Sequence, residues 1–166
     1  MNTRKIVLTA LFSAVALGIY VLESMIAPIS AIPGVKLGLA NVVTLVAVYT
    51  IGKRGAFATL IIRIALSSLL FGHMMSFFFS LAGGIACYGA VCAFQKLLDR
   101  SQMWALGIIS AFAHNLGQII VAIAITSQLA VAYYFLFMIL ASIITGAFTG
   151  VCAMYCVKIL EKSKIL

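Results

Sequence analysis

A few polar side chains interrupt long apolar stretches of this sequence, and these are the residues that could do chemistry. Arg63 lies within one apolar stretch, and His114, Asn115 and Gln118 lie within another. Polar groups are costly in such surroundings and are often functional there. An arginine, an imidazole and two amides offer positive charge and hydrogen bonds, so their chemistry is the recognition of a small anionic or amphipathic molecule.

Three further polar residues, Glu23, Lys36 and Asn41, lie near the ends of the first two apolar stretches. Counting residues from the chain reversals predicts that they share the outer half of a membrane with Asn115 and Gln118. Arg63 is expected near mid-membrane, about 13 Å from the cytoplasmic turn. Polar groups that converge between apolar walls are typical of a ligand pocket.

Each of these residues also has a purely structural interpretation. A single polar side chain in a helix bundle often makes an interhelical hydrogen bond worth ~0.6 kcal/mol. A buried arginine can be satisfied by backbone carbonyls, or here by a long reach to Glu23. The sequence leaves both interpretations open. The predicted substrate-binding set consists of Arg63, Lys36, Asn41, His114, Asn115, Gln118 and Glu23.

The sequence offers no catalytic or metal-binding motif. It lacks a P-loop, an HExxH motif and a Ser-His-Asp arrangement, and Asp99 is its single aspartate. Enzymes that process diphosphates hold Mg²⁺ on clustered carboxylates. We therefore expect no catalytic residue, no metal, no cofactor and no enzymatic activity. The four cysteines form no CxxC pair and are expected to be free apolar side chains.

The composition is that of a membrane protein. Of 166 residues, 65% are hydrophobic and only 8% are charged, and the mean hydropathy is +1.25; a soluble protein would have roughly 25% charged residues. Six apolar stretches predict an all-α, six-helix transmembrane bundle in a single domain over residues 1–166. The predicted spans cover residues 6–27, 35–51, 56–71, 75–94, 104–126 and 131–157.

The basic residues predict how the chain is oriented. With six spans, nine of them fall on one side and Lys36 alone falls on the other. Lysine and arginine are retained on the cytoplasmic side, so both termini are expected in the cytoplasm. The formal charge of +8 then reports orientation, and no nucleic-acid partner is expected. The nine are Arg4, Lys5, Lys53, Arg54, Lys96, Arg100, Lys158, Lys162 and Lys164.

Three stripes of small residues have the four-residue spacing that lets helices approach closely. The first consists of Ala10, Ala14 and Gly18, the second of Ala82, Ala86 and Ala90, and the third of Ser142, Gly146 and Gly150. Such a stripe serves either packing within the bundle or docking to another membrane subunit. The sequence does not distinguish which stripe faces outward.

One segment resembles a known signature. The run Pro33-Gly34-Val35-Lys36-Leu37-Gly38-Leu39-Ala40-Asn41 is similar to that of the bacterial heptaprenyl diphosphate synthase component I family, also called the Gx transporter family. An arginine in the third span and the Gly83-Gly84 pair in the fourth extend the resemblance. The family is similar to the S-components of energy-coupling factor (ECF) importers. Those six-helix proteins bind a vitamin-like ligand near the outer face.

The resemblance implies partners as well as a ligand. S-components dock through small residues of the first helix onto a transmembrane coupling subunit driven by two ATPases, and Ala10 and Ala14 match that motif. The resemblance therefore implies that Ala10, Ala14 and Gly18 face a partner protein. We interpret the chain as an S-component-like uptake subunit of the bacterial cytoplasmic (inner) membrane, in contact with membrane lipid. The alternatives are a non-catalytic membrane partner of an isoprenoid diphosphate synthase and a stand-alone secondary carrier.

Overall fold

The chain forms a bundle of helices, and the computed structural model describes residues 3–25, 38–71, 74–128 and 133–163. Within these ranges there is no strand, so the predicted all-α class is confirmed. Among the described residues, five helices are long and apolar enough to cross a membrane, which makes this a multi-pass membrane protein. The helices are α1 (Thr3–Met25), α2 (Asn41–Thr50), α3 (Gly52–Phe71), α4 (Met74–Phe94), α5 (Met103–Thr126) and α6 (Tyr133–Lys162), with a short 3₁₀ helix η1 (Arg100–Gln102) before α5.

The second helix differs from the expected span of residues 35–51. The chain makes a turn over Gly38, Leu39 and Ala40, and α2 begins only at Asn41. Its 10 residues extend about 15 Å, half the thickness of the hydrocarbon core. At its far end Gly52, with a φ of +83°, makes the reversal into α3, because glycine adopts this left-handed conformation without strain.

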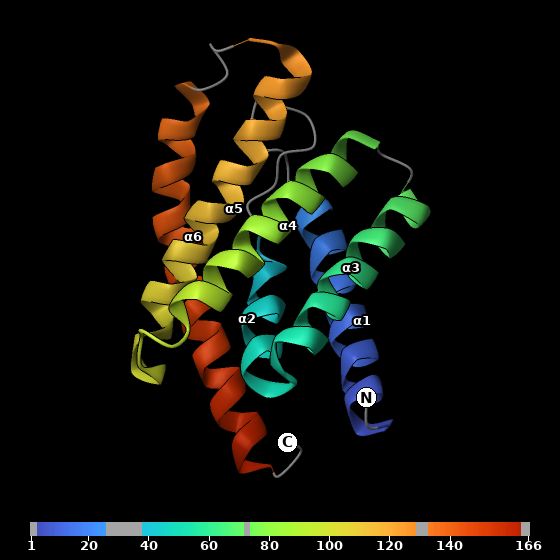
Figure 1. Cartoon of the computed structure of the whole chain (residues 1–166), viewed down its shortest axis with the longest axis vertical. Helices are drawn as coiled ribbons and strands as arrows, with labels where there is room; N and C mark the ends of the chain where they lie inside the picture. The colour runs from blue at the N-terminus through green and yellow to red at the C-terminus, as the bar shows by residue number, and fades with distance from the viewer. Residues whose placement is uncertain (1–2, 26–37, 72–73, 129–132, 164–166) are drawn as a thin grey trace.

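The short α2 lies at the centre of the bundle (Figure 1). It contacts all five longer helices, and its residues from Val43 to Val48 are buried. The pair α1 and α3 packs on one side, α5 and α6 on the other, and α4 crosses between the two pairs. Around α2 the main apolar core includes Phe12, Leu45, Cys87 and Leu106.

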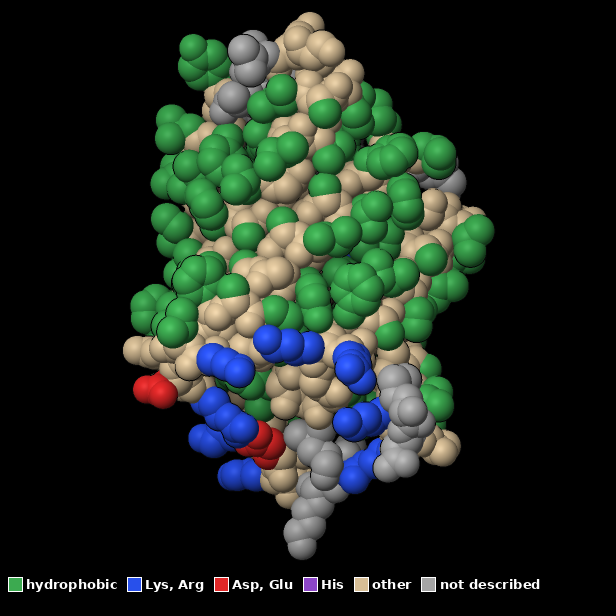
Figure 2. Space-filling view, in the orientation of Figure 1, with side chains coloured by type: hydrophobic (Ala, Val, Ile, Leu, Met, Phe, Trp, Pro, Cys, Tyr) green, Lys and Arg blue, Asp and Glu red, His purple; other side chains and the backbone are tan. Residues whose placement is uncertain are grey.

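The two ends of the bundle differ in charge. The helix α1 begins, and α6 ends, at the same end of the molecule (Figure 1). Figure 2 shows lysine and arginine side chains gathered at this end, below a wide apolar belt. We call it the basic end. Its exposed basic residues are Arg4, Lys5, Lys53, Arg54, Lys96, Arg100, Lys158 and Lys162. The connections α2–α3 and α4–α5 lie here too, as the alternation of charges predicted.

The closest helix packing joins α5 to α6. A Cβ added to Gly107 of α5 would lie only 2.1 Å from the carbonyl oxygen of Gly146 and 2.7 Å from the Cα of Gly150. The third small-residue stripe, which holds these two glycines of α6, therefore serves packing within the bundle. The four cysteines are free, and Cys87 is buried in the main core.

Candidate functional site

Five helices and one turn meet at the middle of the bundle, and four of these helices contribute polar side chains. Along α4, Gly83 lies between Phe79, which belongs to a second apolar core, and Cys87 of the main core. Arg63 and His114 lie near the midpoints of α3 and α5. We call this set the polar cluster, and it consists of Tyr20, Glu23, Gly38, Asn41, Arg63, Gly83, His114 and Gln118.

His114 is enclosed by two glycines on different elements. A Cβ added to Gly83 would lie 2.7 Å from His114 Cε1, and one added to Gly38 would lie 2.9 Å from His114 Cδ2. The imidazole, 3% exposed, therefore fits only because both flanking residues lack a side chain. Its Nε2 lies 3.0 Å from Gln118 Nε2, and this contact holds the ring on the face of α5 that the sequence predicted for both residues.

The turn before α2 is fixed to the cluster from two sides. Gly38 donates its backbone N–H to Glu23 Oε1 at 2.6 Å, which ties the turn to α1. Its φ of +80° is in the left-handed region. On the other side, a Cβ at Gly38 would lie 2.6 Å from Asn41 Nδ2. Asn41, 3% exposed, thus begins α2 at the cluster, so the positive end of the α2 dipole faces this region.

Arg63 is the charged member of the cluster, and it is 4% exposed. Its guanidinium carbon lies 5.9 Å from the centre of the Tyr20 ring on α1, within cation–π range. The Tyr20 hydroxyl in turn shares a hydrogen bond of 2.8 Å with Ser76 on α4. The charge of Arg63 also acts on Glu23 and His114. Arg63 thus lies next to α1, and its charge reaches His114 on α5.

Several polar atoms of the cluster have no hydrogen-bond partner among the described residues. They are Asn41 Nδ2, Arg63 Nη2, His114 Nδ1 and Gln118 Oε1. Three of these four are nitrogens. Leaving a buried polar group unsatisfied costs about 1–3 kcal/mol, and more for a charged one. The arrangement is therefore suited to a bound molecule that presents acceptor oxygens to this level of the bundle.

Not every predicted site residue joins the cluster. Asn115 points toward α6, where its Nδ2 donates to the carbonyl oxygen of Met138 at 3.1 Å and to Ser142 Oγ at 2.8 Å. Asn115 therefore makes an interhelical hydrogen bond, as the structural interpretation of these polar residues expects. Lys36 lies outside the described residues, so its role stays a prediction. Tyr20 and Ser76 were missed, because a tyrosine or a serine in an apolar helix carries no signal that separates it from ordinary packing.

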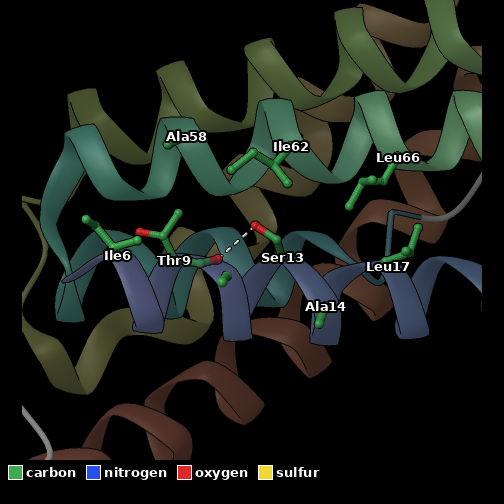
Figure 3. Close-up of a pocket in the computed structure, with 9 residues that line it drawn as sticks. Ile6, Thr9, Ser13, Ala14, Leu17, Ala58, Ile62 and Leu66 are labelled. Carbon is green, nitrogen blue, oxygen red and sulfur yellow. Dashed lines mark hydrogen bonds between the residues drawn. The ribbon is translucent and has the colours of Figure 1, made fainter. Parts of the chain in front are cut away.

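The first small-residue stripe faces outward. Ala10, Ala14 and Gly18 are exposed, and a Cβ added to Gly18 would meet nothing within 4 Å. Ala10 and Ala14 border a groove between α1 and α3 (Figure 3). The second stripe, Ala82, Ala86 and Ala90, is half-buried. Of the three stripes, only the first is thus fully available to another molecule.

We predict that Gly38 can be distinguished from the other left-handed glycine by substitution. Gly38→Ala and Gly52→Ala share the backbone strain, about 1–2 kcal/mol each, because both φ angles are near +80°. Only at Gly38 would the new Cβ collide with Asn41 and His114. Gly38→Ala should therefore lose about 1–3 kcal/mol more unfolding free energy than Gly52→Ala, measured by denaturant titration in detergent. Equal losses would show that the enclosure of His114 is not rigid.

Comparison with known proteins gives one match. A family model described as heptaprenyl diphosphate synthase component I matches residues 12–156. This range includes every residue of the polar cluster and all of α2 to α5. No curated protein and no solved structure matches the chain.

Proposed function

Because the chain belongs to the heptaprenyl diphosphate synthase component I family, we propose that it is a membrane subunit that binds a small anionic molecule and works with a partner protein. The molecule would bind at the polar cluster after entering from the side opposite the basic end. We place the basic end in the cytoplasm, as the retention of lysine and arginine on that side requires. The chain would thus act as the S-component-like subunit of an ECF-type importer, and ATP hydrolysis would occur on other chains.

One observation carries this proposal. Buried donor atoms from α2, α3 and α5 lack hydrogen-bond partners among the described residues, and one of them belongs to a guanidinium. A ligand carboxylate or phosphate would satisfy Arg63 with short, charge-assisted hydrogen bonds. Asn41, His114 and Gln118 would orient the rest of the molecule. Glu23 would act through Gly38, by holding the turn in place, while Lys36 stays a predicted contact.

The ligand itself can be identified from the purified protein. We expect a small acidic molecule to co-purify in a ratio near one per chain, and to be released when the protein is denatured. Mass spectrometry of the released fraction would give its identity. A neutral or cationic molecule at that ratio would contradict the proposed role of Arg63.

The family name supports a second candidate function. It describes a component of heptaprenyl diphosphate synthase, so the partner could be a synthase subunit rather than a coupling subunit with ATPases. The chain would then hold the synthase at the membrane without taking part in the chemistry. The two functions differ in what the chain binds, because only the importer subunit needs an anionic ligand at the polar cluster.

We predict that either partner docks on the exposed stripe of α1. The substitution Ala14→Trp should abolish association with a coupling subunit or a synthase subunit, because small residues there permit close approach of another helix. Folding and ligand content should be nearly unchanged, since Ala14 is exposed. Co-purification with each tagged partner measures the association, and Phe112→Trp, at an exposed site on α5, is the control. Loss of folding in Ala14→Trp would contradict the docking role.

A further inference from the structure

The groove between α1 and α3 is built for an apolar occupant. It has a volume of about 380 Å³, and its two hydroxyl groups are already satisfied within α1; Figure 3 shows the hydrogen bond of Ser13. Thr9 Oγ1 donates to the Lys5 carbonyl at 2.7 Å, and Ser13 Oγ donates to the Thr9 carbonyl at 2.8 Å. The groove therefore offers shape and apolar contact but no free hydrogen bond. Its walls are Ile6, Thr9, Ala10, Ser13, Ala14, Leu17, Ala58, Ile62 and Leu66.

The length of the groove matches one leaflet of a bilayer. On α1 it runs from Ile6 to Leu17, about 16 Å along the helix, and the hydrocarbon core is about 30 Å thick. It begins next to the basic end and stops near the middle of the bundle. A partner helix that crossed the whole membrane would need a groove along the full length of α1, and this groove covers only the half next to the basic end. An acyl chain of a lipid in the leaflet at the basic end has the required length and apolar character.

Positive charge marks the mouth of the groove. Lys5 directly precedes Ile6, and Arg54 lies one turn before Ala58, and both side chains are exposed. Neither α1 nor α3 has an acidic residue in its first turn. Basic residues at the interface attract anionic lipid headgroups, and basic pockets between membrane helices bind them. We propose that the groove holds the acyl chain of an anionic phospholipid whose headgroup lies on Lys5 and Arg54.

This lipid site does not depend on the proposed uptake function, but it affects the docking surface. Ala10 and Ala14 belong both to the groove and to the exposed stripe. A partner helix that packs on these alanines must first displace the acyl chain. The bound lipid would therefore cover the apolar surface of the subunit while it is alone in the membrane.

Native mass spectrometry of the detergent-solubilised protein tests the proposal. The protein is titrated with phosphatidylglycerol and, separately, with phosphatidylcholine of the same acyl chains. We expect phosphatidylglycerol to bind at least about fivefold more tightly, and Lys5→Gln and Arg54→Gln each to weaken it about fivefold, since one basic residue at the interface contributes roughly 1 kcal/mol. Ala58→Phe, which fills the groove, should weaken both lipids.

A matched control separates this site from the general charge of the basic end. Lys158 and Lys162 are exposed at the same end but lie on α6, which does not line the groove. The double variant Lys158→Gln with Lys162→Gln should keep the preference. Equal binding of the two lipids by the wild type, or an equal loss in this control, would overturn the proposal. A lipid-free dimer that Ala58→Phe disrupts would assign the groove to a second copy of the chain instead.

Discussion

Replacing Gly107 by alanine is expected to lower the free energy of unfolding by about 3 kcal/mol, the upper end for inserting a group into a packed interior. The reason is the distance of 2.1 Å between the new Cβ and the Gly146 carbonyl oxygen. The Cβ is held rigidly by the Gly107 backbone and the oxygen belongs to the Gly146 backbone, so neither can rotate away, and α5 and α6 must separate. Unfolding of the purified protein by denaturant, followed by helical circular dichroism, measures the loss.

The control for this prediction is a glycine that also lies within a long apolar helix but has no neighbouring atom where its Cβ would be. A Cβ added to Gly89 of α4 meets nothing within 4 Å. Gly89→Ala should be neutral or stabilise by up to about 1 kcal/mol, because alanine favours the helix. If Gly107→Ala unfolds at the same denaturant concentration as Gly89→Ala, the close approach of α5 to α6 is wrong.

Replacing Arg63 by alanine is expected to reduce ligand binding about 100-fold, because truncating one partner of a buried charged contact costs about 2–5 kcal/mol. Arg63→Lys should recover only part of the binding, since an ammonium cannot form the paired hydrogen bonds of a guanidinium. The molecule identified in the wild-type preparation serves as the probe. Its amount per chain is compared among the three proteins, together with their unfolding curves.

Asn115 supplies the contrast that makes the Arg63 result specific. Asn115→Ala removes the hydrogen bonds to Met138 and Ser142, so it should destabilise the bundle while leaving the ligand in place. Arg63→Ala should show the opposite pattern. Should Arg63→Ala keep the ligand but unfold earlier, Arg63 is a structural residue, and the site must be sought nearer to Asn41 and Gln118.

The sequence was sufficient to predict the long apolar helices and the gathering of basic residues at one end of the bundle. Apolar length determines which segments cross a bilayer, so five of the six expected spans correspond to long apolar helices in the structure. The exception is the second expected span, where α2 is half as long as a full span because the turn at Gly38 sets where the helix begins. That turn depends on a contact with Glu23 from another helix, and apolar length says nothing of such a contact.

The sequence predicted only part of the candidate site, because helix spacing shows which residues share a face but not which neighbouring helix that face contacts. The four-residue spacing of His114 and Gln118 placed them on one face, and the structure joins them. Asn115, one residue away from His114, turns to α6 instead. The outward direction of the first stripe was predicted only through the family resemblance, because surfaces that face lipid and surfaces that face the bundle are both apolar.

The half-length of α2 has a consequence for how the protein is made. The helix α2 has only 10 residues, so by itself it reaches through about half of the hydrocarbon core. It follows α1 and continues through Gly52 into α3. We therefore expect α2 to enter the membrane only together with α3, as a hairpin, and to reach its central place after the helices around it have been inserted.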